Sequence, residues 1–115
     1  MVNDKPNLIV DLTFGFSLKI IAFTEILESQ RKFNMANQLF RSGTSIGANI
    51  SEAQGAESKN DFKHKCKIAY KEAGETEYWL KLCKFAESYP FEQEMLDEVQ
   101  SILRILGKII TTTNG

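Results

Sequence analysis

The chain has 115 residues, 43% of them hydrophobic and 25% charged, which is enough for one domain with a single core and argues against a disordered segment. Its 14 Lys and Arg residues nearly balance 15 Asp and Glu residues, and the net charge of −1 excludes a protein that binds nucleic acid through high overall positive charge. The start of the sequence does not resemble a signal peptide, and charged residues interrupt the most apolar stretch, 8–27, so we expect a cytoplasmic protein without a membrane span.

The first predicted helix covers residues 8–29 and is apolar on two faces. Phe14, Leu18 and Ile21 lie on the second face. Because one stripe is enough to bury a helix in a bundle, this second face predicts a further partner. The first stripe repeats at steps of three and four residues and is assigned to the core: Ile9, Leu12, Phe16, Ile20, Phe23 and Leu27.

The second predicted helix covers residues 34–56 and has small side chains in the middle of its apolar side. Gly43 and Gly47 would let a neighbouring backbone approach closely, but each costs about 1 kcal/mol relative to alanine in a helix. This helix therefore depends on tertiary packing. Its predicted core side consists of Ala36, Leu39, Phe40, Gly43, Ile46, Gly47, Ile50 and Ala53.

The third predicted helix covers residues 59–88. It begins after Ser58, which is followed by Asp61 as in a capping box, and Tyr89-Pro90 interrupts the chain after it. Its core positions repeat every three and four residues, as in a heptad seam: Phe62, Cys66, Ala69, Ala73, Thr76, Leu80 and Cys83.

The fourth predicted helix covers residues 92–110, with apolar positions Met95, Val99, Ile102, Leu106 and Ile109. No second domain or internal repeat is recognisable, so residues 1–115 form a single domain. Four amphipathic helices joined by short connections predict an all-α fold, an antiparallel up-down-up-down four-helix bundle.

Polar residues accompany the core positions of the two middle helices. Because polar groups in a half-buried stripe need partners, we interpret them as a structural network or interface in which Arg41 pairs with Glu72 or Glu75 and Asn49 caps or bridges helices. The alternative, which the sequence leaves open, is a ligand or catalytic pocket at Glu72 and Glu75. The candidates are Arg41, Ser45, Asn49 and Glu52 on one helix, and Glu72, Glu75 and Trp79 in the stripe Lys65, Ile68, Glu72, Glu75, Trp79, Leu82 on the other.

The sequence offers no recognisable catalytic or cofactor motif. His64 is the only histidine, which excludes the paired Glu-x-x-His motifs of di-iron bundles and leaves a single candidate base for nucleophilic catalysis. Cys66 and Cys83 would lie about 25 Å apart along one helix, too far for a disulfide. We therefore expect no metal, no cofactor, no catalytic residues and no enzymatic activity.

A basic edge is predicted on the third helix. Lys59, Lys63, Lys67 and Lys71 recur every four residues over about 18 Å. The ordinary interpretation is a solvated helix face. The functional interpretation is contact with the phosphate backbone of RNA or DNA, multiplied if the protein oligomerises.

Two runs of sequence resemble a known family. The first is Arg41-Ser42-Gly43-Thr44-Ser45-Ile46-Gly47-Ala48-Asn49-Ile50 followed by Glu52-Ala53, and the second is Ile68-Ala69-Tyr70-Lys71-Glu72-Ala73 with Glu75-Thr76 and Tyr78-Trp79-Leu80. They are similar to the small bacterial four helix bundle proteins related to those encoded in intervening sequences of large-subunit ribosomal RNA genes. The resemblance runs from about Leu8 to Ile110 and implies a four-helix protomer that assembles into a homopentameric ring.

The resemblance also implies kinship with the accessory variability protein of diversity-generating retroelements, which binds nucleic acid and a reverse transcriptase. Most members of the family have no established biochemical activity. We therefore expect a non-enzymatic homo-oligomer that acts as an interaction scaffold or adaptor, with a possible protein partner. The alternative is a nucleic-acid-binding accessory protein that uses the lysine edge to contact RNA or DNA.

Overall fold

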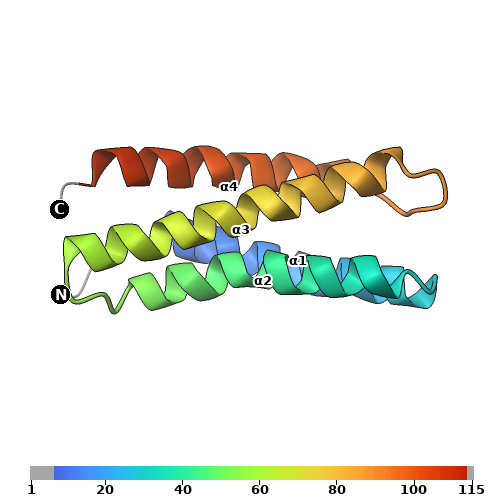
Figure 1. Cartoon of the computed structure of the whole chain (residues 1–115), viewed down its shortest axis with the longest axis horizontal. Helices are drawn as coiled ribbons and strands as arrows, with labels where there is room; N and C mark the ends of the chain where they lie inside the picture. The colour runs from blue at the N-terminus through green and yellow to red at the C-terminus, as the bar shows by residue number, and fades with distance from the viewer. Residues whose placement is uncertain (1–6, 114–115) are drawn as a thin grey trace.

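Four antiparallel α-helices make up most of residues 7–113, the part of the chain that the computed structural model describes (Figure 1). They are α1 (Leu8–Ser29), α2 (Phe33–Ala53), α3 (Lys59–Phe85) and α4 (Gln93–Thr112). No strand occurs in this part of the chain. The prediction of an all-α four-helix bundle is confirmed.

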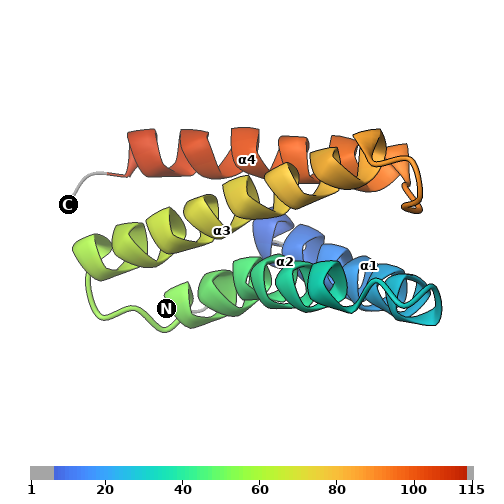
Figure 2. The same ribbon diagram turned by 45° about the vertical axis from the view of Figure 1, so that its right-hand side comes forward.

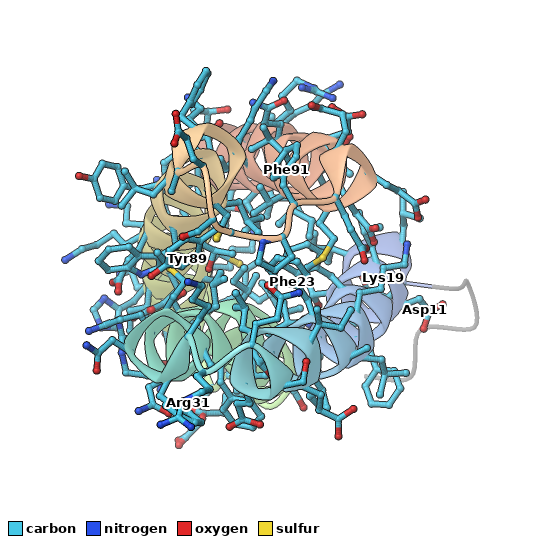
Figure 3. All side chains as sticks on the ribbon, turned by 90° about the vertical axis from the view of Figure 1, so that its right-hand side faces the viewer. Asp11, Lys19, Phe23, Arg31, Tyr89 and Phe91 are labelled. Carbon is cyan, nitrogen blue, oxygen red and sulfur yellow. The ribbon has the colours of Figure 1, made fainter. Side chains whose placement is uncertain are left out.

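Each helix packs against the helices that precede and follow it in the chain, as the two side views show (Figure 1, Figure 2). The pair formed by α1 and α4 closes the bundle with the least extensive packing. Viewed along the bundle, α1 and α2 occupy one side and α3 and α4 the opposite side, with Phe23 at the centre (Figure 3). The molecule therefore has two opposite outer faces, each made by a pair of consecutive helices.

The predicted apolar stripes form the core, with one clear exception. Phe40, which we expected on the core side of α2, has a side chain that is 49% exposed. The reason is that Leu39 occupies the buried row, and the next residue stands about 100° further around a helix. The fully buried large side chains of the core come from all four helices: Phe16, Phe23, Ile20, Leu27, Leu39, Ile46, Ile50, Leu80, Met95, Ile102, Leu106 and Val99.

The two glycines of α2 lie where α1 approaches α2 closely. A Cβ atom added at Gly43 would lie 2.7 Å from Cγ1 of the buried Ile20 side chain. A Cβ atom added at Gly47 would lie 3.1 Å from the Thr13 carbonyl oxygen. The close backbone approach predicted from these glycines is therefore present.

Two helices end three residues earlier than their periodicity suggested. α2 ends at Ala53 because the chain turns before Ser58, whose extended backbone allows its hydroxyl to accept a hydrogen bond from the Asp61 amide at 3.0 Å. α3 ends at Phe85, where Ala86 adopts an extended conformation ahead of the Tyr89-Pro90 break. α2 begins one residue earlier, and α4 begins one later and ends two later, than expected.

Candidate interaction surfaces

Arg41 on α2 joins two carboxylates of α3. Its Nη1 lies 3.2 Å from Glu72 Oε1, and its Nη2 pairs with Glu75 Oε2. The same Glu75 oxygen accepts a hydrogen bond from Trp79 Nε1 at 3.1 Å. The side chains of Glu72 and Glu75 are 22% and 34% exposed. Arg41, Glu72 and Glu75 therefore form a half-exposed ion-pair network between two helices and do not enclose a pocket.

The other polar candidates on α2 divide into two kinds. Ser45 bonds to the Arg41 carbonyl oxygen and Asn49 Nδ2 donates to the Ser45 carbonyl oxygen at 2.8 Å, so both side chains turn back onto their own helix. Asn49, which we expected to cap or bridge helices, forms neither contact, because its short side chain reaches the carbonyl one turn earlier on its own helix. Glu52 instead pairs with Lys65 Nζ at 2.9 Å, and this hydrogen bond raises the pKa of Lys65.

The remaining titratable candidates are isolated. Over residues 7–113 no three His, Cys, Asp or Glu side chains form a group that could hold a metal ion. His64 is exposed. Cys66 and Cys83 are free and buried, and burial raises the pKa of both thiols, that of Cys83 to about 11. Thiols in such surroundings are poor nucleophiles.

The lysine edge, defined as Lys59, Lys63, Lys67 and Lys71, runs along the first half of α3. Lys63 is half-buried and the other three are exposed. In contrast to Lys65, none of the four forms an ion pair with any residue of the described chain. The edge therefore carries four positive charges without a carboxylate partner among residues 7–113.

An open groove of about 410 Å³ lies beside this edge, between α3 and α4. The Tyr70 side chain is 43% exposed, and its ring lies 3.7 Å from where a Cβ of Gly107 would stand. This groove was not predicted from the amino-acid sequence, although a glycine among the apolar positions of the fourth helix could have indicated it. We call it the α3/α4 groove; its lining is Lys67, Tyr70, Lys71, Gly107, Ile110 and Thr111.

The opposite side of the bundle carries an exposed apolar surface. Phe14 and Leu18 are 66% and 54% exposed, and the smaller exposures of Ile21 and Phe40 still leave both in contact with solvent. Phe40 joins this surface instead of the core. We call these four residues the α1/α2 face. It contains two shallow grooves between α1 and α2, one beside Phe14, Gly47 and Ala48 and one beside Ile21, Phe40, Glu25 and Glu28.

A second ion-pair network, which was not predicted from the sequence, links α1 to α4. Lys19 Nζ lies 2.7 Å from Glu98 Oε1 and 2.9 Å from Glu94 Oε1. These hydrogen bonds, that to Glu98 first, raise the pKa of Lys19. Glu94 and Glu98 lie four positions apart on one face of α4, and this spacing could have indicated that they share a lysine or arginine partner.

Comparisons with known proteins agree with this architecture. The family model for the 23S rRNA-intervening sequence protein matches residues 5–112. A solved structure of a protein of unknown function from the S23 ribosomal protein family of Bacteroides thetaiotaomicron is similar, with a TM-score of 0.85 and 41% identity over 90% of this chain and 99% of that chain. No curated protein matches. Neither description names an enzymatic activity, and no helix of the described residues is long and apolar enough to cross a membrane.

Proposed function

Because the chain belongs to the 23S rRNA-intervening sequence protein family, we propose that it is a non-enzymatic, cytoplasmic homo-oligomer that serves as an interaction scaffold. The assembly that we propose is a pentameric ring, as the two runs of sequence that resemble the family imply. The observation that carries the proposal is the exposed α1/α2 face. Burial of apolar surface contributes about 25 cal/mol per Å², so large apolar side chains exposed on one helix pair favour association.

The composition of the α1/α2 face supports a protein contact. Phe14 and Phe40 are large aromatic side chains, which dominate the energetics of protein interfaces. Neither groove of this face is lined by a lysine or arginine. A surface of this kind suits a protein partner better than it suits a nucleic acid.

The test is the mass of the native protein in solution, compared with that of the Phe14→Ser, Leu18→Ser double variant. We expect an oligomer for the native chain and a smaller species for the variant, because both side chains are mostly exposed in the protomer and their loss leaves its core intact. The matched control is Phe85→Ser, which removes a 79% exposed aromatic ring outside the face. A monomeric native protein at micromolar concentration would contradict the proposal.

A second candidate function is nucleic-acid binding through the lysine edge. Two observations favour it: the four lysines have no partner within the described chain, and the exposed Tyr70 ring beside them offers a surface on which a base can stack. The family name and the name of the similar structure also refer to ribosomal RNA and to a ribosomal protein family.

This second candidate is tested with labelled structured RNA and duplex DNA at roughly 50 and 200 mM salt, between which phosphate-driven binding falls by orders of magnitude. We expect Lys63→Glu with Lys67→Glu to abolish binding. The control pair, Lys81→Glu with Lys84→Glu, lies at the other end of α3 and should leave it unchanged. Binding that is insensitive to salt or to the first pair would rule out this surface.

A further inference from the structure

Figure 3 shows α1 and α2 on one side of the bundle and α3 and α4 on the opposite side. The α1/α2 face and the α3/α4 groove, which belong to these two helix pairs, therefore lie on opposite sides. α2 packs against α1 and α3, and α4 packs against α3 and α1, so the two outer faces are separated by the core. One protomer therefore cannot cover either surface with the other. Either surface can be covered only by a second molecule.

The two surfaces carry opposite charge. Glu25 and Glu28 line the groove of the α1/α2 face beside Ile21 and Phe40, both carboxylates are exposed, and neither forms an ion pair within residues 7–113. The face is therefore apolar with an acidic margin.

The α3/α4 groove is apolar with a basic margin. Lys67 and Lys71 line it from α3 without a carboxylate partner in the described chain. On α4, Arg104 and Lys108 precede the lining residues Gly107 and Thr111 by three positions each, which places them on the same side of the helix. Apolar contacts at the centre with opposite charges at the margin match this groove to the α1/α2 face.

We infer that copies of this chain associate head to tail, with the α1/α2 face of one protomer seated on the α3/α4 groove of the next. The inference rests on the proposed homo-oligomer and identifies the two surfaces that form its repeating contact. A contact between two α1/α2 faces would lack the lysines that the α3/α4 groove supplies, since neither groove of the α1/α2 face is lined by a lysine or arginine. A head-to-tail contact uses both surfaces of every protomer and closes into a ring when its rotation closes.

Charge reversal tests the contact. The acidic-margin variant carries Glu25→Lys and Glu28→Lys, and the basic-margin variant carries Lys67→Glu and Lys71→Glu. Each variant alone opposes like charges at every head-to-tail contact, so we expect light scattering to show the mass of the protomer. A ring of five cannot alternate two kinds of chain, so a mixture of the two variants would keep at least one contact between like charges. The rescue is therefore the chain with all four substitutions, in which every contact again joins opposite charges, and we expect it to recover assembly.

Matched controls carry the same charge changes outside both surfaces: Glu57→Lys with Glu87→Lys, and Lys81→Glu with Lys84→Glu. These controls should keep the mass of the native protein. Circular dichroism confirms that every variant is folded, and the chain with all four substitutions guards against misfolding of either single-margin variant.

The outcomes separate this inference from the proposed function. A native chain that is monomeric overturns the homo-oligomer itself. A native oligomer that survives in either margin variant, or a folded chain with all four substitutions that stays monomeric, overturns the head-to-tail contact and leaves the oligomer to form through another surface. A basic-margin variant that stays assembled but loses RNA binding assigns Lys67 and Lys71 to nucleic acid and likewise overturns the inference.

Discussion

The absence of a side chain at Gly43 determines how closely α1 and α2 pack. All three carbon atoms of Ile20 beyond its Cβ lie within 2.9 Å of where a Cβ of Gly43 would stand, and Ile20 is fully buried. Such a β-branched side chain in a filled core has little freedom to move away. Gly43, which lies in the run that resembles the family, is therefore required at this position for the packing of Ile20.

We expect Gly43→Ala to destabilise the protomer by about 1 kcal/mol, because overpacking costs about 1–3 kcal/mol and exceeds the gain of about 1 kcal/mol in helix propensity. Gly15→Ala is the control, since nothing lies within 4 Å of a Cβ at Gly15, and it should stabilise α1 by about 0.5–1 kcal/mol. Urea unfolding measures both free energies. Equal stabilisation by the two substitutions would show that Ile20 accommodates the methyl group.

The buried thiol of Cys83 lowers the free energy of unfolding as the pH becomes alkaline. Burial raises its pKa from 9.0 to about 11, so the folded state holds the proton that the unfolded state releases first. Its contribution to stability is fully present below about pH 9 and is lost as the pH rises to about 11. Urea midpoints on either side of this window should fall more for the native chain than for Cys83→Ala. An identical fall in both would assign the effect to other groups.

The helix pair α2 and α3 is held by polar contacts as well as by the core. Arg41 and Glu52 form ion pairs with α3 near the surface, while the hydroxyls of Ser42 and Thr76 are hydrogen-bonded at 2.9 Å in the interior. Partly exposed ion pairs contribute about 0–1 kcal/mol, whereas a buried polar group left without a partner costs about 1–3 kcal/mol. The interior pair is therefore the stronger constraint on how these helices are aligned.

We expect Thr76→Val to lower the free energy of unfolding by about 1–3 kcal/mol, because it leaves the Ser42 hydroxyl without its partner. The double variant Ser42→Ala, Thr76→Val should lose less than the sum of the two single variants, since neither hydroxyl then remains. Chemical denaturation of the four chains gives the coupling energy. Additive losses would mean that the hydroxyls do not depend on each other.

Helix periodicity predicted the four elements and most of their buried faces, because apolar steps of three and four residues carry that information locally. The position of Phe40 could not be derived in the same way, since it lies at the boundary of the buried side and the neighbouring helix decides its exposure. Helix ends also depended on backbone turns outside the repeat. The third seam, predicted from Phe62 to Cys83, is fully buried from Cys66 onward because these positions follow a heptad without interruption, while Phe62 at its start is only half-buried.

The whole molecule shows surfaces that no single helix could reveal. The sequence indicated the second apolar face of α1 and the lysine edge of α3, since each repeats along one helix. It did not indicate that Tyr70 and Gly107 line one groove, or that Lys19 joins Glu94 and Glu98, because these residues are brought together from distant parts of the chain. Their roles follow only from the arrangement of the four helices around the core.

If the protomers assemble through the α1/α2 face, thermal stability depends on protein concentration. Association that requires the folded state stabilises it by mass action, so we expect Tm to rise as the native chain is concentrated. Phe14→Ser with Leu18→Ser should have a Tm that does not change with concentration. Differential scanning calorimetry over a wide concentration range makes the comparison, and a constant Tm for the native chain would count against folded-state association.

The packing of each helix against its neighbours in the chain also has a consequence for how the protein forms. Contacts between residues close in sequence carry a small loop-closure entropy, and helical bundles with this topology fold within microseconds to milliseconds. Only the pairing of α1 with α4 joins helices that are far apart in the sequence, and it is the least extensive. During synthesis, the hairpin of α1 and α2 can thus form before α4 leaves the ribosome, which shortens the time for which apolar helix faces are open to aggregation.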